Sequence, residues 1–267
     1  MNLFPEELYF VQTVASLAFV NFLIVVSIYL IDRLRPEPIL ELTKAFFLGI
    51  TAGGILLSIK QLDDFSVLSG KWLGPSIQLL WLALLEEVFK LLPILLIVRS
   101  FKYFDEPIDG IIYSAMVASG FAFFEDVGYS IGTSYPMRLF VLARSIPGHV
   151  LFTMIMGYFV GRMAFEQKVK SKELVFKGLL FATLAHAIFN FLILRWSFSL
   201  GVGFVIILVV INAYLVLNIL KHPASVRDEI KVKELKSEPK MWHMSLHLTS
   251  SIGYTTVWWA ILGVLMS

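Results

Sequence analysis

Long apolar segments, each bounded by charged residues, recur along this chain. An α-helix needs about 20 apolar residues to cross the hydrocarbon core of a bilayer, and each segment is close to that length. There are eight of them, at roughly residues 8–31, 42–59, 73–98, 107–129, 138–165, 174–194, 200–220 and 245–266. They lack the apolar and polar alternation of barrel strands. The sequence therefore predicts an all-α polytopic membrane bundle of about eight transmembrane helices.

The composition excludes several other kinds of protein. Of the 267 residues, 58% are hydrophobic and 16% are charged, whereas soluble globular chains carry about 25% charged residues. A soluble fold of this length could not bury so much apolar surface. The net charge is only +2 and no dense basic tract is present, so we expect no nucleic-acid partner. The absence of cysteine excludes disulfides, thiolate metal sites and cysteine nucleophiles.

The basic residues predict how the helices are oriented. Of the 22 Lys and Arg residues, 16 fall near the loops after the first, third, fifth and seventh apolar runs. Cytoplasmic loops are rich in basic residues, so we expect a multi-pass protein of the cell membrane with both termini outside the cytoplasm. Residues 1–267 are predicted to form one transmembrane domain, with a polar core at about 73–194, a mixed-charge cytoplasmic loop at 221–242 and a final span at 245–266.

Polar side chains interrupt four consecutive apolar runs. A charge at the centre of a bilayer costs about 2.5–3.5 kcal/mol on insertion scales, so membrane helices retain one chiefly for a function. The residues concerned are Glu86, Glu87 and Lys90 in the third run, Glu125 in the fourth, Arg144 and His149 in the fifth, and His186 and Asn190 in the sixth. Their concentration on four successive helices predicts one shared polar site inside the bundle.

Helical spacing refines this site. Residues four apart lie on the same side of a helix, and the sequence contains three such pairs: Glu86 with Lys90, Glu125 with Tyr129, and His186 with Asn190. Pro147 and Gly148 precede His149 and would loosen the helix there, because proline removes a backbone hydrogen bond. We interpret Lys90, Tyr129 and Arg144 as supporting partners of the reactive groups.

The residue types at this site suit hydrolysis. A carboxylate in apolar surroundings can act as a general base for water, a histidine can relay a proton, and an Asn amide can donate to an oxyanion. Histidine and glutamate are equally ligands for a divalent metal such as zinc, although the H-E-x-x-H signature is absent. The candidate ligands are Glu86, Glu87, Glu125, His149 and His186. A metal-free site and a metal-dependent site both stay open.

Several motifs together resemble the PrsW-type intramembrane proteases, which are distant relatives of the CAAX-prenyl protease and bacteriocin-immunity group. The resemblance covers roughly residues 81–191. Its motifs are Glu86-Glu87-x-x-Lys90, Asp109-Gly110-x-x-Tyr113, Gly120-Phe121-Ala122-x-x-Glu125-x-x-x-Tyr129, Arg144-x-x-Pro147-x-His149, Met156-Gly157-Tyr158 and His186-x-x-x-Asn190. In the wider CAAX-protease group the second motif reads F-x-x-x-H, whereas this sequence has Phe121-x-x-x-Glu125.

The resemblance implies cleavage of a single-span membrane protein in the lipid bilayer, typically an anti-sigma factor cut on its outer side. It implies that Glu86 and Glu87 activate water, that His149 assists, and that His186 and Asn190 stabilise the oxyanion.

Two other functions are consistent with the residues alone. Intramembrane Glu, His and Lys also build proton relays in transporters, although carriers often show inverted repeats, and here the polar residues occupy only four consecutive runs. A non-catalytic scaffold on a protease fold is the second alternative.

Overall fold

The computed structural model describes residues 36–60, 74–130, 135–165 and 171–221, with a few single positions between residues 11 and 27. Side chains are described in these ranges except at residues 129, 130 and 135–147. All the helices below lie within Met1–Val232, the first of the two units into which the chain divides. The single-domain organisation stays a prediction. The mixed-charge loop, apart from its first residue, and the final span lie outside the described residues.

Every regular element in the described ranges is helical. The helices are α2 (Ile39–Lys60), α4 (Pro75–Ser100), α5 (Asp109–Ser130), α6 (Tyr135–Phe165), α7 (Ser171–Phe191), the π-helical turn η1 (Leu192–Trp196) and α8 (Phe198–Ile219). The predicted all-α fold is confirmed for this part of the chain, and the helices coincide with the six middle spans. The count of eight is not confirmed, because the span at 8–31 lies largely outside the described residues and the span at 245–266 wholly so.

Within the described residues, five helical stretches are long and apolar enough to cross a membrane. They are Ile39–Lys60, Asp109–Gly128, Gly148–Phe165, Ser171–Trp196 and Phe198–Ile219. Helix α4 has 26 residues, ample length for a span. The middle of α4 carries three charged residues, Glu86, Glu87 and Lys90. Charge therefore sets α4 apart from the other helices.

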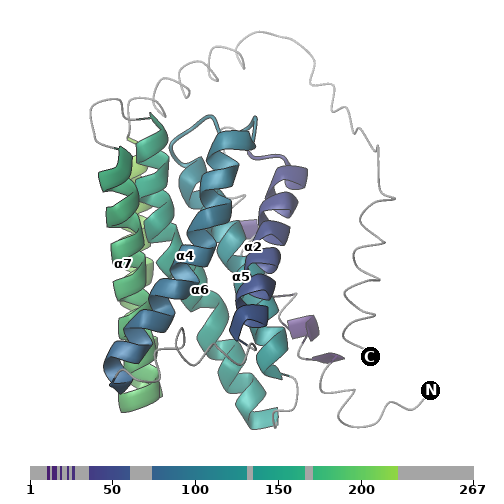
Figure 1. Cartoon of the computed structure of the whole chain (residues 1–267), viewed down its shortest axis with the longest axis vertical. Helices are drawn as coiled ribbons and strands as arrows, with labels where there is room; N and C mark the ends of the chain where they lie inside the picture. Colours follow the sequence, from purple (N-terminus) through teal and green to yellow (C-terminus); the bar gives the residue numbers. More distant parts are fainter. Residues whose placement is uncertain are drawn as a thin grey trace, which may run out of the picture. The chain divides into compact units, whose positions relative to one another are not determined.

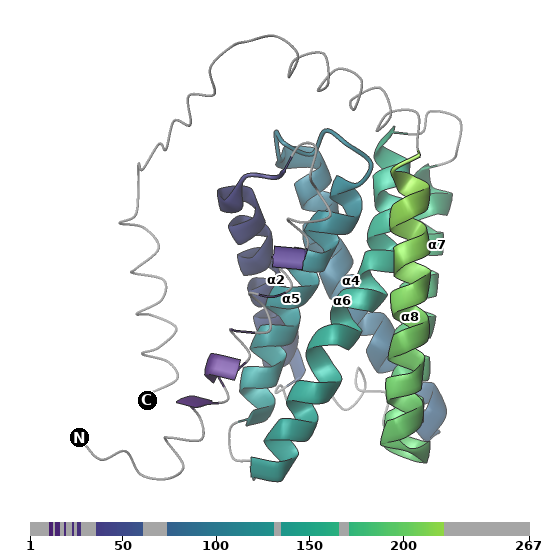
Figure 2. The same cartoon turned by 180° about the vertical axis from the view of Figure 1, so that it is seen from behind.

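The helices α4 to α8 run alternately in opposite directions (Figures 1 and 2). We call the two ends of the bundle the Lys60 end, where α2 and α5 finish and α4 and α6 begin, and the Asp109 end, where α4 finishes and α5 begins. Helix α5 packs against both α2 and α6, while α7 packs against α4 and α6. The four helices that carry the predicted site are therefore neighbours.

Glycines allow α5 to approach its two neighbours closely. A methyl group at Gly120 of α5 would overlap the Phe46 carbonyl oxygen of α2, and one at Gly49 of α2 would overlap the Val117 carbonyl oxygen of α5. On its other side, a methyl group at Gly110 would overlap the Gly157 carbonyl oxygen of α6. Small residues at such crossings are how membrane helices maximise their packing contacts.

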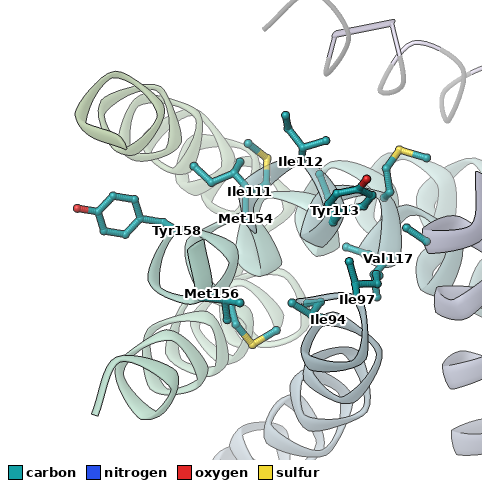
Figure 3. Close-up of a cluster of buried hydrophobic side chains, with 14 of the residues drawn as sticks. Ile94, Ile97, Ile111, Ile112, Tyr113, Val117, Met154, Met156 and Tyr158 are labelled. Carbon is teal, nitrogen blue, oxygen red and sulfur yellow. The ribbon is translucent and has the colours of Figure 1, made fainter. Parts of the chain in front are cut away.

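An apolar cluster fills the bundle interior toward the Asp109 end. Figure 3 shows side chains from three helices converging there. Helix α4 contributes Ile94 and Ile97, α5 contributes Ile111, Ile112 and Val117, and α6 contributes Met154 and Met156. All of these side chains are buried. The polar residues of the predicted site are thereby confined to the part of the interior nearer the Lys60 end.

A separate polar group lies at the start of α5. The Asp109 carboxylate accepts hydrogen bonds from the backbone N–H groups of Asp105 (2.8 Å) and Glu106 (2.6 Å). One turn further along, the buried Tyr113 hydroxyl donates to Glu37. Asp109 and Glu125 are 16 residues apart on one helix, which is about 24 Å along its axis. The Asp109 motif therefore tethers the segment before α2 rather than contributing to the site around Glu125.

Candidate active site

Helix α4 brings three charged side chains into the bundle interior. Glu86, Glu87 and Lys90 are all buried, and the side chains of Glu87 and Lys90 are completely shielded from solvent. Glu87 and Lys90 form an ion pair across one helical turn, with Lys90 Nζ 2.7 Å from Glu87 Oε1. A buried charge of either sign is costly unless it is paired, so this contact fixes the positions of both side chains.

Both oxygens of Glu87 have partners on other helices. Its Oε1 lies 2.9 Å from His186 Nδ1 of α7, and its Oε2 accepts a hydrogen bond of 3.1 Å from the Thr153 hydroxyl of α6. Three helices therefore meet at one carboxylate. A carboxylate that binds one imidazole nitrogen fixes the orientation of the ring, so that the other nitrogen faces a defined direction.

The other nitrogen of His186 faces the second carboxylate. His186 Nε2 lies 3.6 Å from Glu86 Oε2. The opposite oxygen of Glu86 is 3.0 Å from Lys60 Nζ, at the end of α2. Glu86 thus lies between a histidine on α7 and a lysine on α2, and its rotation by about 100° from Glu87 on α4 gives it different partners.

His149 of α6 lies between Lys90 and Glu125. Its Nδ1 is 2.7 Å from Lys90 Nζ, and its Nε2 is 3.0 Å from Glu125 Oε2 of α5. The Nε2 contact with Glu125 has the distance of an ion pair but not the angle of a hydrogen bond.

Aromatic rings enclose the two histidines. Phe152 stacks on His186 with ring centroids 4.9 Å apart, and the His149 ring stands edge-on to His186 at 4.9 Å. Lys90 Nζ lies 4.8 Å from the centroid of the Phe121 ring, a distance at which the ring face attracts a cation. These walls hold the imidazoles in place and lower the local dielectric around the charges.

Three of the five candidate metal ligands converge. One ligand atom each from Glu86, His149 and His186 lies within 4.8 Å of the others, and all three residues are buried. Two imidazoles and one carboxylate are a ligand set that catalytic zinc uses, with a fourth position left for water. The remaining two candidates, Glu87 and Glu125, each contact one of the two histidines, as the outer carboxylates of metal sites do. The donor set therefore fits a divalent metal.

A small cavity adjoins this cluster between α2 and α5. It holds about 20 Å³, enough for about one water molecule. Its lining consists of Gly53, Leu56, Leu57 and Lys60 from α2, with Phe121 and Glu125 from α5. Lys60 contacts Glu86 and Glu125 contacts His149. A molecule in the cavity would therefore meet side chains that touch two of the three candidate ligands.

The other predicted site residues stand apart from these contacts. Asn190 is partly buried one turn beyond His186 on α7, and within the described part of the chain it has no hydrogen-bond partner. Tyr129 and Arg144 belong to α5 and α6, and their side chains lie outside the described residues. The roles assigned to these three residues stay predictions.

Two residues of the site were not predicted from the sequence. Lys60 occupies the last position of α2, where a lysine ordinarily reaches toward the interface. Thr153 is an uncharged residue in an apolar run. The signal that could have found Thr153 is its position four residues after His149, on the same face of α6.

One protein family and several curated proteins are similar to this chain. Residues 37–217 match the model of the family described as PrsW family intramembrane metalloprotease. The chain is 34% identical to Protease PrsW of Clostridioides difficile (strain 630) over 68% of this chain and 80% of that protein. It is 29% identical to Protease PrsW of Geobacillus kaustophilus (strain HTA426), over 65% and 77% of the two chains.

A third relative, Protease PrsW of Bacillus subtilis (strain 168), is 28% identical over 63% of this chain and 77% of that protein. No solved structure matches this chain. The matched range, 37–217, contains every contact described for the site. The chain belongs to the PrsW family of intramembrane metalloproteases, and it is a multi-pass membrane protein.

Proposed function

We propose that this protein hydrolyses a peptide bond in or next to the transmembrane segment of another membrane protein, using water that a glutamate of the site activates. The observation that carries the proposal is the convergence of Glu86, His149 and His186 within 4.8 Å in the buried interior of the bundle. Such a cluster is expensive to maintain in a membrane unless it serves a function.

Glu86, His149 and His186 would hold a divalent metal, for which zinc is the best candidate by ligand type. A metal bound there would supply Lewis-acid chemistry, which makes water a stronger nucleophile and polarises the substrate carbonyl. Other residues of the site hold these ligands in position. Glu87 and Thr153 orient His186, and Lys90 balances the charge of Glu87.

The contacts support separate roles for the three glutamates. Glu87 is fully enclosed and both its oxygens are occupied, which favours a positioning role. Glu86 is a ligand in the proposed metal site. Glu125 lines the cavity, so its carboxylate is the one placed to take a proton from a water molecule there. We therefore assign water activation to Glu125, with His149 beside it as the group that shares its charge.

The substrate and the orientation belong to the same proposal. By family resemblance the substrate is a single-span membrane protein such as an anti-sigma factor. The distribution of basic residues favours both termini outside the cytoplasm. In that orientation the Lys60 end faces outward, and the site lies in the outer half of the membrane, which is consistent with cleavage on the outer side.

The test compares the N-termini of membrane proteins by mass spectrometry in cells that express either the wild type or the Glu86→Gln/Glu87→Gln variant. The expected result is a new N-terminus close to a membrane span in the wild-type cells alone. Equal expression of both proteins is the control, measured by quantifying peptides of the protease itself. The same new N-terminus at equal abundance in both samples would refute the proposed chemistry.

A further inference from the structure

We propose that the cavity between α2 and α5 holds the attacking water and that the scissile carbonyl binds beside this cavity. We further propose that Lys60, in the cavity wall, stabilises the negative charge that develops on the carbonyl oxygen. This inference rests on the proposed function and adds to it a catalytic group that stands outside every motif of the sequence. It also assigns the substrate to one side of the site, the side formed by α2 and α5.

The position of Lys60 is the first observation. A lysine at the end of a membrane helix can extend its ammonium group to the interface, but Lys60 Nζ instead lies 3.0 Å from Glu86 Oε1. Its side chain is 19% exposed and forms part of the cavity wall. The ammonium group is therefore directed to the metal-ligand cluster and also borders the space beside it.

A comparison of two lysines is the second observation. Among the described residues, Lys60 and Lys90 are the lysines that contact the carboxylates of the site. Lys90 is completely buried, contacts Glu87 and His149, and does not line the cavity. Lys60 is thus the one of the two that can touch a molecule bound in the cavity.

The two charged groups of the cavity wall suit the two partners of the reaction. Glu125 lines it on α5 and Lys60 on α2. As the water oxygen bonds to the carbonyl carbon, the π electron pair of the C=O bond moves to the carbonyl oxygen, and a water proton passes to the Glu125 carboxylate. The new oxyanion then lies beside Lys60. An ammonium group carries three donors, so it can keep its contact with Glu86 while donating to this oxygen.

The residues first expected to stabilise the oxyanion are less well placed for it. Both nitrogens of His186 face carboxylates, Glu87 at 2.9 Å and Glu86 at 3.6 Å. Asn190 is not part of the cavity wall. A cation that borders the cavity is the better electrostatic partner for a charge that appears only in the transition state.

The experiment uses the purified full-length protein in detergent and measures cleavage of the membrane protein that yields the new N-terminus described above, with bound zinc quantified by plasma mass spectrometry. Lys60→Met should lower kcat about 10²–10³-fold, the usual loss for one oxyanion donor. KM and zinc content should stay close to wild type. Lys60→Arg should retain more activity than Lys60→Met, because it keeps a donor at the same place.

Lys44→Met is the matched control. Lys44 lies on the same helix, pairs with Glu41 and has a side chain that is 41% exposed, so its substitution should leave kcat unchanged. A Lys60→Met enzyme with kcat within about threefold of wild type would overturn the proposal. So would a Lys60→Met protein that loses zinc in proportion to its activity, because Lys60 would then serve only to position Glu86.

Leu57→Phe tests the cavity without changing Lys60, so it still tests the proposal if Lys60→Met does not fold. Leu57→Phe should fill the cavity and reduce kcat while zinc stays bound, whereas Ile55→Phe alters an exposed residue of the same helix and should be silent. Unchanged kcat in Leu57→Phe would refute the cavity as the reaction site. Failure of the proposed function would give a different result from failure of the Lys60 proposal, because Glu86→Gln would then keep full activity.

Discussion

Glu87 and His186 are 99 residues apart in the chain, yet Glu87 Oε1 and His186 Nδ1 lie 2.9 Å apart in the buried interior. The contact joins α4 to α7 and sets which nitrogen of His186 is available to a metal. Glu86 lies on the far side of that ring, with its Oε2 3.6 Å from Nε2. Glu86 and Glu87, which are adjacent on α4, therefore lie beside opposite ring nitrogens of the same histidine.

This arrangement predicts that zinc and activity are lost together when a ligand is removed. Glu86→Gln, His149→Ala and His186→Ala should each release zinc and lower turnover by about 10³-fold, because a catalytic metal contributes several kcal/mol. Treatment of the wild type with 1,10-phenanthroline should have the same effect, and added zinc should restore activity. Full activity in metal-depleted protein would contradict the metal assignment.

Glu87→Gln should instead weaken zinc binding without abolishing it. Loss of the carboxylate that orients a histidine ligand typically costs 10–100-fold in metal affinity, and competition with a fluorescent chelator measures this. A loss of affinity as complete as that of Glu86→Gln would show that Glu87 is itself a ligand.

The Glu87–Lys90 pair also predicts a coupled effect on stability. Removal of one partner of a buried ion pair costs about 3–5 kcal/mol, because the other charge is left without compensation. Lys90→Met should therefore destabilise the protein strongly, and the double variant Glu87→Gln/Lys90→Met should be more stable than Lys90→Met. Unfolding in mixed micelles with increasing SDS measures both. Additive effects of the two substitutions would mean that the pair is not coupled.

The sequence could supply the membrane fold and the residues Glu86, Glu87, His149 and His186, because charged and imidazole groups in apolar runs are conspicuous and costly. It could not predict which of those residues contact one another. The contact of Glu87 with His186 depends on α4 packing against α7, and nothing in the order of the spans specifies which helices touch.

Lys60 and Thr153 could not be identified as site residues from the sequence either. A lysine at a helix end is unremarkable in a membrane protein, and a threonine in a helix can satisfy its own hydroxyl at the preceding turn. Each becomes a site residue only through a neighbour on another helix, Glu86 for Lys60 and Glu87 for Thr153. Such contacts are properties of the packed bundle.

The close crossing of α2 and α5 predicts a sensitive position away from the charges. Gly120→Leu should destabilise the protein by about 1–3 kcal/mol or more, because the new side chain would overlap the Phe46 backbone. Gly203→Leu on α8 is the control, since a Cβ atom there meets nothing within 4 Å. Thermal unfolding in detergent should separate the two variants clearly, and equal melting temperatures would argue against the close crossing.

The proposed orientation can be tested because the chain contains no cysteine. Lys71→Cys and Lys102→Cys would each create a unique thiol, in the loops before and after the third predicted span. A membrane-impermeant maleimide added to intact cells should label the first variant and not the second. Labelling of Lys102→Cys alone would reverse the orientation and place the site in the inner half of the membrane.

Glu125→Gln separates the proposed base from the metal ligands. Glu125 contacts His149 Nε2 at 3.0 Å and lines the cavity, but it is not among the three converging residues. The variant should therefore keep its zinc while kcat falls about 10²–10⁴-fold, the range for a lost general base. Glu87→Gln, measured beside it at saturating zinc, should recover most of its turnover because its defect lies in ligand orientation. If Glu87→Gln stays inactive with zinc bound while Glu125→Gln turns over normally, the base is Glu87, and the cavity wall at Glu125 serves substrate binding alone.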